Sequence, residues 1–179
     1  MRAVSVACKA PKQRARFLFF IKIMVIPMSQ EQEQAPTLNI EKVYVKDISY
    51  EAPNAPQVFM EQRVPEVGVQ LNIAHSVLNQ KDGLYEVVLA VTVTAKFQDK
   101  NVFLVEVQQG GLFRIAGIPL ADLPMVLEIG CPNILLPFAR EAINDLVGKG
   151  GFPQLLINPV NFEGLYQQKL AAASTATTH

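Results

Sequence analysis

The chain has 179 residues, half of them hydrophobic and 18% charged, which suits one domain with an apolar core. Its 16 basic and 16 acidic side chains balance, but six of the basic ones lie in the first 27 residues, where there is no acid. The rest of the chain therefore carries a net charge of −6, which disfavours nucleic acid as a partner and favours a basic one.

Residues 1–27 form a basic leader. Its apolar run, Phe17–Ile26, is interrupted by Lys22 and is shorter than the roughly 20 residues that span a bilayer. A secretory signal would place small residues after this run, where the chain has Pro27 instead. We expect that translation starts at Met28 and that residues 1–27 come from a mis-assigned start upstream of it. A membrane-surface anchor and a cleaved targeting peptide are the alternatives.

From Met28 onward we find no targeting or spanning segment, and the single cysteine there, Cys131, cannot form an internal disulfide. A reducing compartment is therefore indicated, and we expect a cytoplasmic protein. With only Cys131, His75 and His179 as soft or imidazole ligands, this part of the chain lacks the residues for a structural zinc site. We expect no metal and no cofactor.

Two strands are predicted after a polar segment. Residues 28–37 are rich in Gln and Glu, so we expect them to be disordered. Alternating apolar residues predict strands at Leu38–Glu51 and Glu66–Val77. The apolar positions predicted to share a face are Leu38, Ile40, Tyr44, Ile48 and Tyr50 in the first strand and Val67, Val69, Leu71 and Ile73 in the second.

The third strand is the clearest, because residues 85–97 place an apolar side chain at every second position. A turn at residues 98–101 leads to the fourth strand, predicted at Val102–Gln109. Glycine weakens a strand, so we expect Gly110 and Gly111 to mark a bulge or a bend.

The pattern becomes helical after the fourth strand. A short helix is predicted at Leu120–Ile129, with Pro124 inside it, and a long one follows and ends at Gly148–Gly151. An irregular apolar connection then leads to a last helix. Four antiparallel strands followed by helices predict an α+β domain over residues 38–170, with a disordered tail at residues 171–179.

No catalytic motif is present: the sequence contains no GxSxG, HExxH or CxxC. Gly148–Gly151 includes a Gly-Lys pair, but it ends a helix, whereas a phosphate loop opens one. His75 has no nucleophile motif near it. We therefore expect a protein that is not an enzyme.

Carboxylates gather on two of the predicted strands. Asp47 and Glu51 are four residues apart and so share a strand face, and Glu106 shares a face with the apolar Leu104. If the first and fourth strands are exposed on that side, the four residues form an acidic patch with an apolar contact. An ordinary solvated sheet face is the alternative.

Apolar residues also lie in proline-containing loops. Val58 and Phe59 follow two prolines, and Phe152, Leu155 and Phe162 lie in or beside the connection after the long helix. Proline prevents such segments from pairing as strands, so they could line a groove for an extended apolar peptide. The alternative is that they belong to the core.

Five motifs together resemble the bacterial protein-export chaperone family SecB. In order they are VYVKDISYEAPNAPQVF, YEVVLAVTVTA, VEVQQGGLFRIAGI, CPNILLPFAREAINDLV and GGFPQLLINPVNF, and the resemblance covers nearly all of residues 38–166. It implies a four-stranded antiparallel sheet with helices on one side, assembled as a homotetramer, a dimer of dimers. It also implies an ATP-independent holdase that keeps preproteins unfolded and delivers them to the translocation ATPase SecA.

The resemblance assigns roles to the candidate residues. It implies that Asp47, Glu51, Leu104 and Glu106 bind SecA. It further implies a peptide groove lined by Val58, Phe59, Phe138, Phe152, Leu155 and Phe162. The helix at Leu120–Ile129 is expected at the tetramer interface, with edge strands pairing inside each dimer.

Two departures from the family pattern concern Pro124, which could shorten the interface helix, and the tail, which carries no acid. Two other hypotheses remain open. One is a related chaperone for another client, such as an antitoxin. The other is a small-ligand-binding or isomerase-like α+β domain, for which His75 is the only polar pocket residue that we can nominate.

Overall fold

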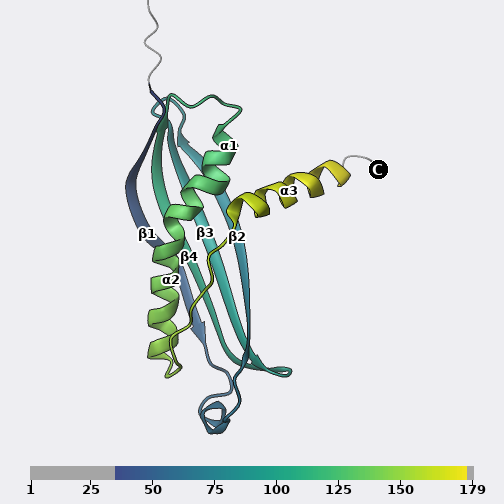
Figure 1. The fold of residues 1–179 in the computed structure, drawn as a ribbon. Coiled ribbons are helices and arrows are strands. Elements are labelled where there is room, and N and C mark those ends of the chain that lie inside the picture. Colours follow the sequence, from purple (N-terminus) through teal and green to yellow (C-terminus); the bar gives the residue numbers. More distant parts are fainter. Residues whose placement is uncertain (1–34, 177–179) are drawn as a thin grey trace, which may run out of the picture. The chain divides into compact units, whose positions relative to one another are not determined.

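The structure is a computed structural model that describes residues 35–176, with side chains described as far as residue 172 (Figure 1). The predicted leader at residues 1–27 and most of the predicted disordered segment at residues 28–37 therefore lie outside the described residues. Residues 35 and 36 have no regular structure, and the first strand begins directly after them.

Four long strands form one antiparallel sheet, as predicted. They are β1 (Thr37–Glu51), β2 (Glu66–Asn79), β3 (Leu84–Phe97) and β4 (Lys100–Ala116), in the spatial order β1-β4-β3-β2. The connection from β1 to β2 contains a short 3₁₀ helix, η1 (Gln57–Met60). β1 and β2 are consequently the two edges of the sheet.

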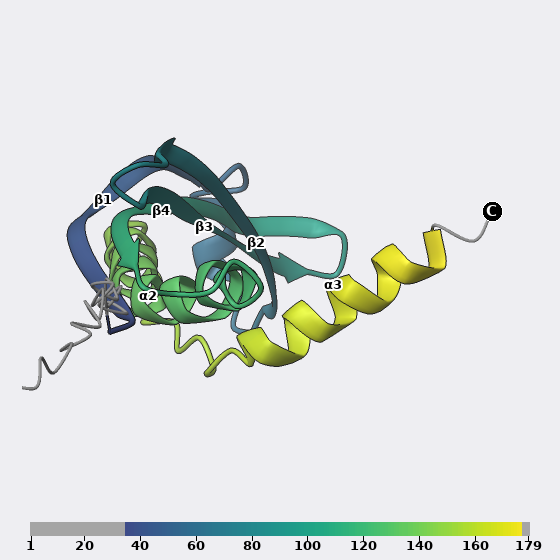
Figure 2. The same ribbon diagram turned by 90° about the horizontal axis from the view of Figure 1, so that it is seen from above.

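Helices cover one face of this sheet. The helical region runs without interruption through α1 (Leu123–Met125), the π-helical turn η2 (Val126–Gly130) and α2 (Cys131–Lys149). Figure 2 shows α2 lying on one side of the curved sheet. We call the sheet face that contacts α2 the inner face and the opposite one the outer face.

The core forms where α2 meets β3 and β4. Residues at every fourth position of α2 are fully or almost fully buried, and so are alternate residues of the two central strands. These are Cys131, Leu135, Ala139, Ile143 and Val147 on the helix, Val87, Leu89, Val91, Val93 and Ala95 on β3, and Val105, Val107 and Phe113 on β4. Alternation in the strands and a four-residue repeat in the helix thus create one apolar interface.

The two helices predicted over residues 120–151 are joined in the structure. Pro124 lies in the first turn of α1 rather than in a helix interior, so its missing N–H removes no helical hydrogen bond. Pro137 lies inside α2, where it does remove one. The helical region ends as predicted, with Gly151 at φ +83°.

The last helix, α3 (Phe162–Ala176), continues six residues past the predicted end of the domain at residue 170. Alanine-rich sequence supports this extension, because alanine has the highest helix propensity. The expected disordered tail is therefore helical as far as Ala176.

β1 contains two bulges that the sequence pattern does not reveal. Glu41 and Lys46 have no partner on β4, and each extra residue reverses the faces on which the following side chains lie. The prediction that Tyr44 shares a face with Ile48 is therefore wrong. Tyr44 lies opposite Gly110, on the outer face.

The bulge predicted at Gly110 and Gly111 is absent, and β4 continues through both residues to Ala116. Close packing accounts for these glycines instead. A Cβ atom at Gly110 would lie 2.6 Å from the ring of Tyr44, and one at Gly111 would lie 2.6 Å from the ring of Phe113. Gly110 thus leaves room for the Tyr44 ring on the outer face of the sheet, and Gly111 leaves room for the Phe113 ring on the inner face.

We predict that Gly110→Ala lowers the free energy of unfolding by about 1–3 kcal/mol, because the Tyr44 ring must move. Gly148→Ala is the matched control. No atom lies within 4 Å of its added Cβ, and alanine favours a helix over glycine, so we expect stability to rise by about 0.5–1 kcal/mol. Urea denaturation measures both changes. Equal stability of the two variants would contradict the packing explanation.

Candidate binding sites

The structure brings the four predicted acidic-patch residues together on the outer face. In the β1–β4 register, Glu51 lies opposite Leu104 and Ser49 opposite Glu106, and Asp47 is two residues further along β1. Directly opposite residues of an antiparallel pair project on the same side. We call Asp47, Glu51, Leu104 and Glu106 the acidic patch.

The acidic patch is open to a partner. Asp47 and Glu51 are exposed, and Leu104 and Glu106 are half-buried. Among the described residues, none of the three carboxylates forms a salt bridge. The Oδ1 atom of Asp47 accepts a hydrogen bond from the Ile48 amide at 2.9 Å, and Glu106 accepts one from Gln108 at 3.4 Å. The negative charges are thus available to a cationic partner.

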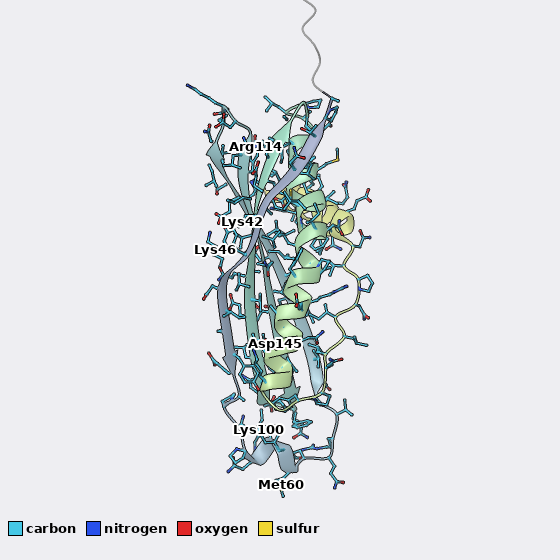
Figure 3. All side chains as sticks on the ribbon, turned by 90° about the vertical axis from the view of Figure 1, so that its left-hand side faces the viewer. Lys42, Lys46, Met60, Lys100, Arg114 and Asp145 are labelled. Carbon is cyan, nitrogen blue, oxygen red and sulfur yellow. The ribbon has the colours of Figure 1, made fainter. Side chains whose placement is uncertain are left out.

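A second charged group lies next to the acidic patch on the outer face. Glu86 of β3 accepts hydrogen bonds from the Tyr44 hydroxyl and from Lys46 Nζ, the latter at 2.8 Å. Figure 3 shows Lys42 and Lys46 along β1. Because Lys46 is already paired with Glu86, it does not neutralise the adjoining Asp47.

This group shifts two pKa values. Burial, followed by the hydrogen bond and the charge of Glu86, raises the pKa of Tyr44 to about 12. The hydrogen bond from Lys46, with a smaller contribution from Tyr44, lowers the pKa of Glu86. At neutral pH the Tyr44 phenol is therefore protonated and the Glu86 carboxylate is ionised. Their hydrogen bond reaches from β1 to β3, over the intervening strand β4.

The second site is an apolar cavity of about 400 Å³ at the end of the sheet where β1 leads into η1. Four of the predicted groove residues, Val58, Phe59, Phe152 and Leu155, line it. Its other lining residues are Glu61, Arg63, Val64, Pro65, Val67, Phe97, Val102, Phe103, Gly151 and Pro153. We call this space the aromatic cavity.

Aromatic packing shapes the aromatic cavity. The ring centroids of Phe59 and Phe152 are 5.1 Å apart, and those of Phe103 and Phe152 are 5.0 Å apart. Val58 is buried beneath, whereas Phe59 is 50% exposed. Aromatic pairs at these distances are mutually attractive, and the exposed Phe59 ring is free to contact another molecule.

Two aromatic residues of the cavity were not predicted. Phe97 is the last residue of β3 and Phe103 lies near the start of β4, and the hairpin between them brings both to the cavity. Asn54 of the η1 loop donates a hydrogen bond to the Asn101 carbonyl at 2.7 Å, so this loop lies against the hairpin. Met60 and Lys100 mark this end in Figure 3. Apolar residues alternate along both strands next to this turn, and that sequence pattern could have predicted that Phe97 and Phe103 lie together.

A second hollow, of about 500 Å³, extends the aromatic cavity along the inner face of β2. It shares Val67 and Leu155 with the cavity and is bounded by Val69, Leu71 and the connection at residues 155–160. Together the two hollows form a groove between β2 and the connection that follows α2.

The two remaining predicted groove residues lie elsewhere. Phe138, on the flank of α2, is 43% exposed and lines a different cleft of about 980 Å³ between α2 and β1. Phe162, at the start of α3, is 1% exposed and belongs to the core. Helix periodicity could not show which flank of α2 faces β2.

Within residues 35–176, no three His, Cys, Asp or Glu side chains lie together so that they could hold a metal ion. Cys131 is fully buried, and burial raises the pKa of its thiol to about 12, which keeps the thiol protonated at neutral pH. His75 Nε2 lies 3.4 Å from the buried Glu128, which also pairs with Lys169 at 2.6 Å. These three residues link β2, η2 and α3.

The described helices include none with both the length and the apolar character needed to cross a bilayer. Residues 35–172 thus present an open apolar groove on one face of the sheet and an uncovered acidic patch on the other, two surfaces suited to binding other molecules. The fold and these sites thus define a chaperone-like binding protein.

Comparison with known proteins gives the family. The family profile described as "Preprotein translocase subunit SecB" matches residues 31–173. The chain is 52% identical over 151 residues to the protein-export protein SecB of Methylobacillus flagellatus, covering 83% of this chain and 95% of that protein. It is also 52% identical over 149 residues to that of Chromobacterium violaceum, covering 83% and 98%. The chain belongs to the SecB family of protein-export chaperones.

A solved structure supports the fold. The SecB-like chaperone of Mycobacterium tuberculosis, in complex with a peptide from an antitoxin, superposes with a TM-score of 0.59 at 16% sequence identity. The alignment covers 69% of this chain and 90% of that one. The predicted fold class, an α+β sheet with helices on one side, is confirmed.

We predict that Tyr44 stabilises the fold fully below pH 10 and that this contribution is lost as the pH rises from 10.0 towards about 12. The raised pKa favours the neutral phenol in the folded state. In Glu86→Gln the pKa of Tyr44 should fall, because the charge of Glu86 is removed while burial remains. Ultraviolet titration of the phenols, with Tyr44→Phe to assign the signal, measures this. A pKa unchanged by Glu86→Gln would refute the assignment.

Proposed function

We propose that this protein is an ATP-independent holdase that keeps newly made preproteins unfolded and hands them to SecA in the bacterial cytoplasm. The observation that carries the proposal is the pair of open surfaces on opposite faces of one sheet, an apolar groove inside and an acidic patch outside. In this proposal the two surfaces bind other proteins and perform no chemical reaction, so the proposed activity needs no catalysis and no cofactor.

Client binding is assigned to the groove. An unfolded segment exposes apolar and aromatic side chains, and burying them contributes roughly 25 cal/mol per Å² of apolar surface. Phe59, Phe152 and Leu155 provide such surface beside the buried Val58. Because the hollow along β2 continues the aromatic cavity, several residues of an extended client can bind at once.

Docking to SecA is assigned to the acidic patch. Three carboxylates without salt bridges among the described residues attract a basic segment of SecA, and Leu104 adds an apolar contact between them. In this proposal the metal of the partner's basic, zinc-bearing tail belongs to SecA.

We further propose a homotetramer, a dimer of dimers. β1 is an edge strand, and its inner-face residues Val45 and Ile48 are 48% and 43% exposed. Unpaired edges and exposed apolar side chains favour pairing with a second copy. Leu120 and Met125, 82% and 46% exposed, are available to the interface expected at Leu120–Ile129.

An antitoxin client is less favoured. The antitoxin peptide belongs to the Mycobacterium tuberculosis protein, and 16% identity to that protein supports the fold alone. The relatives at about half identity are protein-export proteins. An isomerase-like pocket is disfavoured too, since His75 pairs with Glu128 instead of facing a cavity with other polar groups.

We predict that the protein, at a stoichiometric ratio and without nucleotide, delays refolding of a chemically unfolded client. Phe59→Ala and Phe152→Ala should each weaken client binding by about tenfold or more, since burying a large apolar side chain contributes about 1.5–3 kcal/mol. Met60→Ala is the control, because Met60 is 85% exposed and lies outside the aromatic cavity. Refolding delayed equally by all variants would exclude the groove, and no delay by the wild type would exclude the holdase.

We predict that Asp47→Ala combined with Glu51→Ala lowers the affinity for SecA by about tenfold or more and leaves the holdase activity unchanged. Each lost hydrogen bond to a charged group costs on the order of 1 kcal/mol or more. Asp99→Ala with Glu163→Ala removes the same charge from exposed positions outside the patch and is the control. Isothermal titration at physiological salt measures the affinities. An equal loss in both double variants would indicate net charge, not the patch.

A further inference from the structure

Arg63 occupies a distinctive position at the edge of the aromatic cavity. It lies on the irregular segment between η1 and β2 and lines both this cavity and a neighbouring polar hollow of about 150 Å³. The two spaces share Arg63, Glu61, Phe97, Val58 and Val102. The Arg63 guanidinium therefore stands at the boundary between an apolar and a polar space.

Two contacts hold the guanidinium in place. Its central carbon lies 5.5 Å from the centroid of the Phe97 ring, within the range of a cation–π interaction. Its Nε and Nη2 atoms donate hydrogen bonds to one carboxylate oxygen of Glu61, at 3.2 Å and 3.0 Å. Phe97 and Glu61 thus fix both the position and the orientation of a planar cation.

These contacts leave part of the guanidinium unused. A cation attracts any aromatic ring within about 6 Å of it, so the contact with Phe97 does not exclude a second ring. Glu61 binds at the edge and not on the faces. The Arg63 side chain is 57% exposed, so a ring from another molecule can reach the cation.

We infer that Arg63 is a specificity-determining residue that selects aromatic side chains in client segments through a cation–π contact between its guanidinium and the client ring. This inference rests on the proposed client groove. A client ring at the edge of the aromatic cavity would contact the Arg63 cation through its π face, whereas an aliphatic side chain of equal volume has no π face to offer. The groove would then discriminate by electron distribution in addition to apolar area.

Exposed cation–π contacts are modest, so the effect has to be isolated from hydrophobicity. Phenylalanine and cyclohexylalanine have nearly the same shape, but only phenylalanine has a π system. We would use two fluorescein-labelled peptides, otherwise identical, that carry one or the other as their single large apolar side chain. The ratio of their dissociation constants removes the contribution of the rest of the peptide.

The test measures this ratio by fluorescence anisotropy for the wild type and for Arg63→Met, which keeps an apolar stem over Phe97 but removes the cation. We expect Arg63→Met to reduce the preference for the phenylalanine peptide by about two- to fivefold, the size of an exposed cation–π contact. Arg114→Met is the control. Arg114 is likewise paired with a glutamate, Glu41 at 2.6 Å, but lies on the outer face.

The outcomes separate the inference from the proposed function. A reduced preference in Arg63→Met, with an unchanged one in Arg114→Met, supports the inference. If Phe59→Ala weakens the binding of both peptides but Arg63→Met leaves their ratio unchanged, the inference is overturned and the groove stands. If Phe59→Ala affects neither peptide, the groove is overturned and the inference with it. Urea denaturation of Arg63→Met confirms that the variant folds.

Discussion

The architecture depends on the mismatch between one helix and a four-stranded sheet. A helix with its side chains is about 10–12 Å wide, and neighbouring strands are about 4.8 Å apart, so α2 covers only about two strands. It covers β3 and β4, whose inner-face residues are fully buried against Leu135 and Ile143. The inner faces of β1 and β2 extend beyond it on either side. Their alternating apolar residues, formed by the same pattern that builds the core, therefore stay partly exposed.

The two uncovered margins differ because the chain crosses only one of them. On the β2 side, the connection after α2 runs past Val67 and Val69 and makes a groove with an aromatic end. On the β1 side, no such segment is present among the described residues, and the open cleft leaves Val45 and Ile48 partly exposed. The proposed client groove and the proposed subunit contact thus have one physical origin. Neither needs a dedicated domain.

Sequence alone could predict most of the fold, since periodicity of two located all four strands and placed the acidic patch on one face. It could not locate the bulges at Glu41 and Lys46, because a bulge arises from pairing with another strand and leaves no local signal. Gly110 was misinterpreted for the same reason: the ring that requires it belongs to Tyr44 of the paired strand β1, which is distant in sequence. The groove was predicted only in part, since Phe138 lies outside it. The side of α2 that faces β2 depends on how the helix is rotated against the sheet, and tertiary packing alone decides that rotation.

Phe103 and Leu104 are neighbours in β4, yet one lines the aromatic cavity and the other belongs to the acidic patch. Neighbouring strand residues point to opposite sides, so the backbone of a single strand separates the two surfaces. If the groove binds the client and the acidic patch binds SecA, as proposed, the two partners do not compete for the same atoms, and the sheet can carry both at once as a ternary complex. In such a complex the client is already held beside SecA before it is released. Delivery becomes a transfer within one assembly, whose rate does not depend on a second diffusional encounter.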